Sequence, residues 1–258
     1  MDARRAVVAL VGALLVAALL AGDLAARPAT AAGRDAPRVL PDGRSYVAHE
    51  PGRPVSAAVV VLHSLHHDWL EGPAQGWSAE SERSGFLAVY PEGDGSWNAG
   101  LCCAPANDPA RFPAGPGRAT GRDDVGFLTR VIADVRARYR VRHVWLAGYS
   151  NGGMMAERLL AERPWLSDRL AVWASAPEMA FPGAWTGRAW LGHGALDATV
   201  PWAGGITTIA GHKVPMRPGQ ATRRWLVGAR LSAHVYIALG HAPPAWWPQA
   251  AWAALAAP

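Results

Sequence analysis

The stretch Trp145-Leu146-Ala147-Gly148-Tyr149-Ser150-Asn151-Gly152-Gly153-Met154-Met155 decides how this chain folds. An apolar run from Val144 to Ala147 predicts a buried strand, and a helical pattern resumes at Met154. Between them the spacing G-x-S-x-G puts Ser150 at the apex of a strand-to-helix turn. Such a turn strains the backbone of its apex residue, and its flanking positions must be small because they pack against the neighbouring strand and helix. We therefore expect the hydroxyl of Ser150 to point outward at the positive end of the new helix.

Apolar runs alternate with segments of helical spacing along the rest of the chain. Strands are predicted at Tyr46 to His49, Ala57 to Leu62, Phe86 to Tyr90, Val144 to Ala147, Leu170 to Ala174, Ala189 to Leu191 and Ala233 to Ala238. Helices are predicted at Trp77 to Ser84, from Asp123-Asp124 onward, from Met154 onward and at Thr222 to Val227. Ala32 to Pro41 is expected to be a flexible leader, and Trp97 to Gly121 a long surface loop. This alternation predicts an α/β fold, with a mostly parallel central sheet and helices on both faces.

The amino end has the pattern of a secretory signal peptide. A basic start ends at Arg5, Ala6 to Ala21 is apolar, and Ala29-Thr30-Ala31 offers a small-x-small cleavage site. An uncleaved membrane anchor is the alternative, although the apolar run is near the lower length limit for spanning a bilayer. We expect residues 1–31 to be removed and residues 32–258 to form one catalytic domain. The mature protein is then expected to be extracellular, without stable membrane insertion.

Composition restricts the partners. The net charge of +5 falls to about +4 without residues 1–31, because three Arg and two Asp are lost. A basic surface favours contact with anionic surfaces such as the cell envelope, and the scattered basic residues give no nucleic-acid site. The thirteen Trp could form a binding surface or could simply be buried. The adjacent Cys102 and Cys103 could form a vicinal disulfide or remain thiols.

Three candidates for chemistry fall at the ends of predicted strands, in the order serine, acid, histidine. Ser150 follows one strand, Asp197 follows Ala189 to Leu191, and His241 follows the last strand. Functional groups gather at the carboxyl ends of parallel strands, and this is the chain order of α/β-hydrolases. A serine hydroxyl becomes a nucleophile when an imidazole takes its proton, and the imidazole needs a carboxylate to fix its tautomer. The sequence therefore predicts Ser150, Asp197 and His241 as the catalytic residues.

Each partner of Ser150 also has a structural interpretation. Asp197 could be an aspartate that forms a turn at the end of its strand. His241 has three rivals: His234 lies inside a strand pattern, His212 lies in a glycine-rich loop, and His193 is very near the acid in sequence. The position of His241 at a strand end favours it as the base.

An oxyanion would need backbone donors. The amide of Asn151, directly after the predicted nucleophile, is one, and we expect the amide of Leu65 to be the other. The same loop also carries a cluster of candidate metal ligands. These are His63, His66, His67 and Asp68. Because the metallo-hydrolase pattern H-x-H-x-D-H is not present, we expect neutral loop histidines, no metal and no cofactor.

With these residues in place, the chain resembles the secreted poly(3-hydroxybutyrate) depolymerase and feruloyl esterase family of α/β-hydrolases. The resemblance covers nearly all of the mature chain. The matching stretches are V-V-V-L-H (59–63), G-F-L-A-V-Y-P-E (85–92), W-N-A-G-L-C-C (97–103), D-D-V-G-F-L (123–128), G-Y-S-N-G-G-M-M (148–155), H-G-A-L-D-A-T-V-P (193–201) and G-H (240–241). Together these motifs are far more specific than G-x-S-x-G alone. The resemblance implies a serine esterase with Ser150 as nucleophile, Asp197 as acid and His241 as base, acting on small-molecule or polymeric esters of hydroxy or aromatic acids.

The chain departs from the family pattern in three places. Where members usually carry His-Gly after the first strand, this chain has Ser64, whose side chain could narrow the oxyanion pocket or move the Leu65 amide. The histidine lies in Leu239-Gly240-His241-Ala242-Pro243 rather than in G-G-H-x-W-P-G. The segment between Asp197 and His241 is short, which would trim substrate-binding loops. Without a polymer-binding module, soluble or amorphous esters are expected as substrates rather than crystalline polymer.

Two other functions fit the same sequence. The Ser64 substitution and the shortened carboxyl part would suit a non-catalytic, Trp-rich module that binds envelope or polysaccharide on a hydrolase fold, although the intact Ser, Asp and His set argues against decay. Transfer of the acyl group to an alcohol would use the same residues as hydrolysis. The sequence does not separate transfer from hydrolysis.

Overall fold

The structure, a computed structural model, describes residues 36–55, 57–100, 122–176, 185–209, 212–219 and 230–258. The signal peptide expected at residues 1–31, the two cysteines and the helix expected at Thr222 to Val227 lie outside the described residues. Most of the long loop expected from Trp97 to Gly121 also lies outside them. Within the described part of the chain, no helix is long and apolar enough to cross a membrane.

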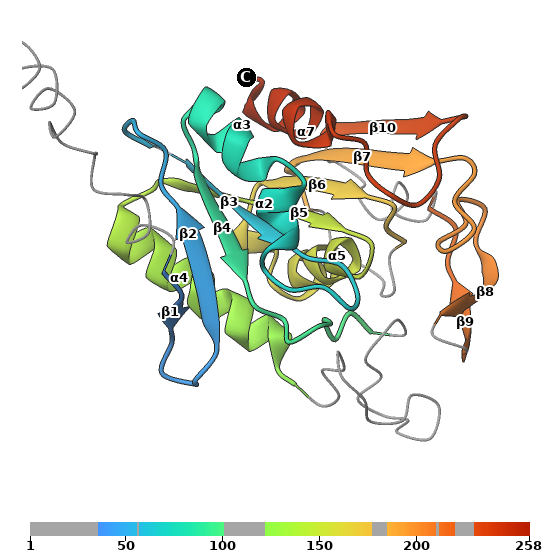
Figure 1. The fold of residues 1–258 in the computed structure, drawn as a ribbon, viewed down its shortest axis with the longest axis horizontal. Helices are drawn as coiled ribbons and strands as arrows, with labels where there is room; N and C mark the ends of the chain where they lie inside the picture. The colour runs from blue at the N-terminus through green and yellow to red at the C-terminus, as the bar shows by residue number, and fades with distance from the viewer. Residues whose placement is uncertain (1–35, 56, 101–121, 177–184, 210–211, 220–229) are drawn as a thin grey trace, which may run out of the picture. The chain divides into compact units, whose positions relative to one another are not determined.

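A mostly parallel sheet of eight strands lies at the centre of the domain, in the order β1-β2-β4-β3-β5-β6-β7-β10 (Figure 1). Its strands are β1 (Arg38–Val39), β2 (Ser45–His49), β3 (Ala57–Leu62), β4 (Leu87–Pro91), β5 (His143–Tyr149), β6 (Arg169–Trp173), β7 (Arg188–Gly194) and β10 (Arg230–Tyr236). At one edge β2 pairs antiparallel with both β1 and β4, and every neighbouring pair from β4 to β10 is parallel. Because parallel strands end at one edge of the sheet, the loops after β3, β5, β7 and β10 meet there.

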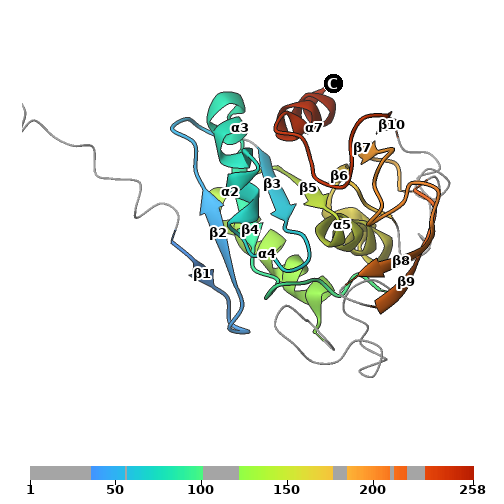
Figure 2. The same ribbon diagram turned by 45° about the vertical axis from the view of Figure 1, so that its right-hand side comes forward.

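Helices cover both faces of this sheet. They are α2 (Glu71–Ala74), α3 (Trp77–Ser84), α4 (Asp124–Tyr139), α5 (Asn151–Glu162), the short 3-10 helix η3 (Pro164–Leu166) and α7 (Trp247–Ala256). Figures 1 and 2 show α4 and α5 on one face, and α3 and α7 on the other. Two separate clusters of buried side chains correspond to these two layers. The expected α/β architecture, with helices on both faces, is confirmed.

The predicted elements follow from hydrophobic pattern, and their bounds match closely where that pattern is strong. β3, with the sequence A-A-V-V-V-L, is buried at all six positions, as expected for a central parallel strand. The predicted helix from Asp123-Asp124 is α4, and the Asp123 side chain caps it by accepting a hydrogen bond from the Gly126 amide at 2.7 Å. β5 extends two residues beyond the predicted end at Ala147, up to Tyr149.

Most tryptophans of the described residues belong to the core. Trp77, Trp97, Trp173 and Trp247 are fully buried, whereas Trp165 and Trp246 are exposed. Trp77 packs edge-on against Trp247 at 5.2 Å between ring centroids, which joins α3 to α7. The high Trp content therefore serves mainly to fill the space between helices and sheet.

Several elements were not predicted. The expected flexible leader contains β1, which pairs with β2. The short segment between Asp197 and His241 contains a separate antiparallel hairpin, β8 (Gly205–Ile209) and β9 (His212–Met216). α2 and α7 were also missed, because four residues are too few to show a helical period and the alanine-rich α7 has almost no polar face.

β1 is fixed to the rest of the domain by Asp134 of α4. Its carboxylate accepts hydrogen bonds from the Arg38 guanidinium and, at 2.6 Å, from the Tyr46 hydroxyl. Hydrogen bonds from Arg38 and Tyr46 outweigh the effect of burial and hold the pKa of Asp134 at about 2, below the ordinary value of 3.8. The ionised carboxylate therefore stabilises the native state above pH 4 or so, and this contribution is lost as the pH falls towards 2.

We predict that Asp134→Asn lowers the urea midpoint of unfolding at neutral pH, because the asparagine cannot accept both charge-assisted bonds. The difference from wild type should shrink when the measurement is repeated below pH 3. Asp168→Asn, which changes an exposed carboxylate 4.0 Å from Arg169, is the control and should leave the midpoint nearly unchanged. A difference for Asp134→Asn that is the same at both pH values would contradict this assignment.

Candidate active site

The turn between β5 and α5 holds Ser150 in a strained conformation. Its φ of 53° and ψ of −120° lie in a region that residues with a Cβ rarely adopt, and it forms the amino-terminal cap of α5. A Cβ on Gly152 would come within 2.2 Å of the Leu62 carbonyl oxygen and 2.4 Å of the His63 carbonyl oxygen. A Cβ on Gly148 would lie 2.5 Å from the Gly152 carbonyl oxygen. Both glycines of G-x-S-x-G are therefore needed because the start of α5 lies directly against the ends of β3 and β5.

Ser150, His241 and Asp197 form a continuous chain of hydrogen bonds. The Ser150 Oγ lies 2.9 Å from the His241 Nε2, and the His241 Nδ1 lies 2.8 Å from the Asp197 Oδ2. The three residues follow β5, β10 and β7, as the sequence pattern predicts. When the Nδ1–H of His241 donates a hydrogen bond to the carboxylate, the Nε2 is the nitrogen that can accept the proton of the serine hydroxyl.

Asp197 uses its two carboxylate oxygens differently. Oδ1 accepts hydrogen bonds from the amides of Thr199 at 2.9 Å and Val200 at 2.8 Å, while Oδ2 faces His241. The turn-forming interpretation of this aspartate is therefore correct and is compatible with its contact to the histidine. Burial alone would raise the pKa of Asp197, but hydrogen bonds from His193 and His241 and the Val200 amide together hold the pKa well below its usual range. The group is thus an anion beside the imidazole at neutral pH.

His193 is a neighbour of this carboxylate that the sequence analysis did not assign to the site. Its Nε2 donates to the Val200 carbonyl oxygen at 2.7 Å and lies 3.3 Å from the Asp197 Oδ2. It therefore holds the loop that carries Asp197 and Val200 in place from the end of β7. The spacing His193-x-x-x-Asp197 across the end of a buried strand is the feature of the sequence that could have indicated this contact. Of the other rivals, His234 lies on β10, where its Nε2 is 2.5 Å from the Ser232 Oγ, and the side chain of His212 lies outside the described residues.

The loops that carry Asp197 and His241 are bonded to each other. The amide of Leu196 donates to the Leu239 carbonyl oxygen at 2.9 Å. A Cβ on Gly194 would lie 2.2 Å from the carbonyl oxygens of both Leu239 and Gly240. This contact between backbones sets the distance between acid and histidine, because neither loop can move without the other.

The loop after β3 is held by Glu71, at the start of α2. Its carboxylate accepts a hydrogen bond from the Ser64 amide at 2.5 Å and another from the Ser64 hydroxyl at 2.7 Å. Ser64 is 5% exposed, and its φ is not among the positive values found in the described residues. The departure from Gly at this position therefore places no strain on the backbone. Leu65, next in the chain, lines a cavity together with Ser150, which is where a donor to an oxyanion must lie.

His63 serves the loop rather than a metal. Its Nδ1 donates to the Ser64 carbonyl oxygen at 2.8 Å, and its Nε2 accepts from the Gly93 amide at 2.9 Å. Burial lowers the pKa of His63, which keeps the ring neutral with both nitrogens occupied. Among the described residues, no three His, Cys, Asp or Glu side chains are grouped as metal ligands would be.

Asn151, the residue after Ser150, is fixed by its side chain. Its Oδ1 accepts from the Trp97 amide at 2.7 Å, and its Nδ2 donates to the Trp97 carbonyl oxygen at 3.1 Å. The Trp97 indole in turn donates to the His63 carbonyl oxygen at 2.9 Å. Trp97 therefore ties the backbone of the first residue of α5 to the loop after β3. In the described part of the chain, neither the Asn151 nor the Leu65 amide is among the donors of the hydrogen bonds found.

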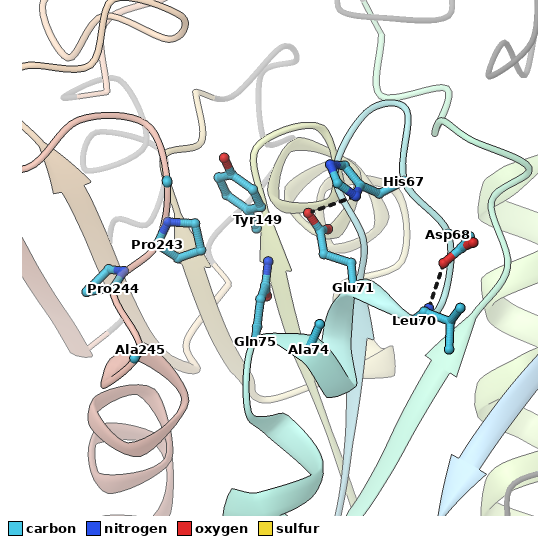
Figure 3. A pocket seen from close by; sticks show the side chains of 11 residues that line it. His67, Asp68, Leu70, Glu71, Ala74, Gln75, Tyr149, Pro243, Pro244 and Ala245 are labelled. Atoms are coloured by element: carbon cyan, nitrogen blue, oxygen red, sulfur yellow. Dashed lines mark hydrogen bonds and ion pairs between the residues drawn. The ribbon is translucent and has the colours of Figure 1, made fainter.

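Two cavities lie at this end of the sheet. The smaller, of about 320 Å³, contains Ser150 and His241 in its wall. The larger, of about 620 Å³, lies between α2 and the segment from Ala242 to Ala245 (Figure 3). Tyr149 and His67 line both cavities. The two cavities therefore adjoin at Tyr149, the residue before Ser150, and at His67.

A mostly parallel eight-stranded sheet, with a serine on a strained turn between β5 and α5, defines the α/β-hydrolase fold. The chain is similar in structure to a carboxylesterase from Mesorhizobium loti, with a TM-score of 0.60, 20% identity, and coverage of 86% of this chain and 99% of that chain. TT1662 from Thermus thermophilus gives a TM-score of 0.60 at 18% identity, covering 86% of this chain and 96% of that one. An acetyl xylan esterase from Aspergillus awamori gives 0.54 at 14% identity, covering 78% and 90%.

In sequence, no family model matches the chain, and no curated protein matches it. At these identities the structural similarity establishes the fold. The resemblance to poly(3-hydroxybutyrate) depolymerases and feruloyl esterases stays a prediction from the motifs.

We predict that Gly152→Ala destabilises the protein by about 2 kcal/mol or more, because the new Cβ meets backbone oxygens that cannot turn aside. Gly153→Ala is the matched control in the same helix, since its Cβ would meet the Ser175 side chain, which can shift, at 2.9 Å and would stay 3.2 Å from the nearest backbone oxygen, that of Gly148. Urea unfolding of both variants measures the difference. Equal stability of the two variants would show that the close approach of α5 to β3 is not what requires the glycine.

Proposed function

We propose that this protein is an exported serine esterase that hydrolyses carboxylic esters. The observation that carries the proposal is the hydrogen-bonded chain from the Ser150 Oγ through His241 to the buried Asp197. A serine at the apex of a strained turn, an imidazole held in one tautomer and an ionised carboxylate behind it are the parts that acyl transfer through a serine requires. The structural similarity to a carboxylesterase and to an acetyl xylan esterase supports an ester as the substrate.

In the proposed reaction, the Ser150 Oγ attacks the ester carbonyl carbon while the His241 Nε2 takes the hydroxyl proton. The negative charge that develops on the carbonyl oxygen is stabilised by the amides of Asn151 and Leu65. His241 then gives its proton to the leaving alcohol, which leaves an acyl group on Ser150. A water molecule, deprotonated by His241, attacks the acyl carbon and releases the acid, so that Ser150 recovers its proton. Asp197 stabilises the protonated imidazole in both halves of the reaction.

The more specific part of the proposal is the class of ester that the protein hydrolyses. The motifs around Trp97, Asp123 and Ser150 resemble those of enzymes that act on hydroxyalkanoate oligomers or on feruloyl and acetyl esters, and we propose one of these as the substrate. Under this proposal Ser64 does not block the site, because its hydroxyl is hydrogen-bonded to Glu71. This contact explains the Ser64 substitution, which was one of the two features that favoured a Trp-rich binding module. The burial of most described tryptophans also speaks against that alternative, because few of them are left to bind a ligand.

We predict that the protein hydrolyses short nitrophenyl esters and reacts with a fluorophosphonate probe, and that Ser150→Ala lowers ester turnover at least about 1,000-fold and abolishes labelling. Ser232→Ala is the control. Ser232 also has a histidine nitrogen within 2.5 Å, but among the described residues no carboxylate is hydrogen-bonded to that histidine. This variant should label and turn over ester as the wild type does.

Turnover that survives in a folded Ser150→Ala protein, or a folded wild type that the probe does not label, would refute the esterase proposal. The export part is tested separately by sequencing the amino end of protein collected from the culture medium. A new amino end near residue 32 is expected, and retention of the intact chain in the cell would contradict export.

A further inference from the structure

Each of the two adjoining cavities is suited to one part of an ester, either the acyl half or the alcohol half. This inference rests on the proposed function. The smaller cavity is lined around Ser150 by apolar and polar side chains, among them Leu65, Met154, Val200, Ile209, Thr199 and Thr208. The larger cavity has the segment directly after His241 as one wall. Because His241 must deliver its proton to the departing oxygen, the alcohol half of the ester leaves on the His241 side. The acyl half then occupies the smaller cavity, which Ser150 itself lines.

Tyr149 stands at the junction between the two cavities. Its ring lies 5.1 Å from the His241 ring, between centroids, and Figure 3 shows it facing the gap between α2 and Pro243. Gln75, from the end of α2, is drawn beside it in the same gap. Neither the Tyr149 hydroxyl nor the side-chain amide of Gln75 is hydrogen-bonded to another of the described residues. Both polar groups are therefore free to bind hydroxyl groups of a ligand.

The charge of the larger cavity is one-sided. Asp68 and Glu71 line it, the His67 Nδ1 lies 3.7 Å from the Glu71 Oε1, and among its described lining residues there is no Lys or Arg. Glu71 and Asp197 also raise the pKa of Tyr149, after burial, so its hydroxyl stays protonated beside these carboxylates. An anionic group in this cavity would be repelled by the two carboxylates, and no Lys or Arg of the described lining would bind it.

We propose that the larger cavity is the binding site for the alcohol half of the ester, and that it selects a neutral, hydroxyl-bearing alcohol against one that carries a carboxylate. At about 620 Å³ it falls within the usual range of small-molecule sites, about 300–1,000 Å³. The proposal favours esters of sugar-like alcohols over hydroxyalkanoate oligomers that end in a free acid.

The test compares 3-acetoxybutanamide with 3-acetoxybutyrate, which share the acyl group and the shape of the alcohol and differ in charge. We expect kcat/KM for acetate release to be about three- to tenfold higher for the amide, and the ratio to shrink when salt is added. Gln75→Lys, which places a cation in the cavity, should lower the ratio about tenfold, whereas the uncharged Gln75→Met should leave it unchanged.

A ratio near one that Gln75→Lys does not move, in a protein that still hydrolyses nitrophenyl acetate, would refute the assignment of the larger cavity. Failure to hydrolyse nitrophenyl acetate would instead refute the esterase proposal itself. The two failures are therefore distinguishable in one set of measurements.

A second inference comes from a different observation, the hydrogen bonds of Ser64. Glu71 accepts from both the amide and the hydroxyl of Ser64, which fixes the residue directly before Leu65. The turn continues with a 3.4 Å hydrogen bond from the His67 amide to the Ser64 carbonyl oxygen, and with His66 at a φ of 64°. We infer that Glu71 is a positioning residue, which aims the Leu65 amide at the oxyanion.

A glutamine in place of Glu71 keeps the size of the side chain but offers Ser64 one acceptor instead of two. Glu71→Gln should therefore lower kcat about 10- to 100-fold with little change in KM, because an oxyanion donor acts in the transition state. The affinity for a trifluoromethyl ketone, which forms a tetrahedral adduct, should fall by a similar factor. Glu162→Gln, which changes a carboxylate paired with Arg158 on α5, is the control and should leave both quantities unchanged.

Thermal unfolding of Glu71→Gln shows whether the domain is still folded. An unchanged kcat in the folded variant would refute the positioning role. A rise in KM at constant kcat would refute it as well, since it would show that Glu71 acts on substrate binding in the larger cavity.

Discussion

The close approach of α5 to the end of β3 is the constraint on which the rest of the site depends. Gly152 lies so near the carbonyl oxygens of Leu62 and His63 that no side chain fits between them. This contact places the first turn of the helix beside the loop that follows β3. Ser150 must then adopt a positive φ to connect β5 to that helix. The strain is balanced by the packing of the whole α5 layer, where almost every residue is buried.

Polar contacts around the site are satisfied by neighbouring loops rather than by solvent. Asp197 accepts two backbone amides on one oxygen and faces histidine nitrogens on the other. A buried carboxylate needs this number of donors, because burial by itself would favour its neutral form. His63 and Asn151 are likewise bonded at both ends of their side chains. The loops therefore hold each other in place, and the geometry of the serine and histidine follows from the backbone.

The positions of Ser150, Asp197 and His241 at one edge of the sheet could be predicted because each follows a segment with a strand pattern, and parallel strands end at one edge. The central strands were predictable for the same reason: full burial selects continuous Val, Leu and Ala. The hairpin β8–β9 could not be found, since its strands mix polar and apolar residues in the sequence G-I-T-T-I and H-K-V-P-M. Glu71 and His193 were missed because their role depends on which oxygen or amide they meet, and that information lies in loop conformation.

The exchange of Gly for Ser64 shows how a departure from a motif should be weighed. Glycine is required where φ is positive or where a backbone approaches closely, and Ser64 meets neither condition. The hydroxyl instead needs an acceptor, because the residue is buried, and Glu71 supplies one seven residues later. The pair replaces a flexible position by one with two directed hydrogen bonds. Ser64 and Glu71 therefore act as a pair. With serine in place of the family's glycine, the two hydrogen bonds to Glu71 restrict the loop after β3 more than a glycine would.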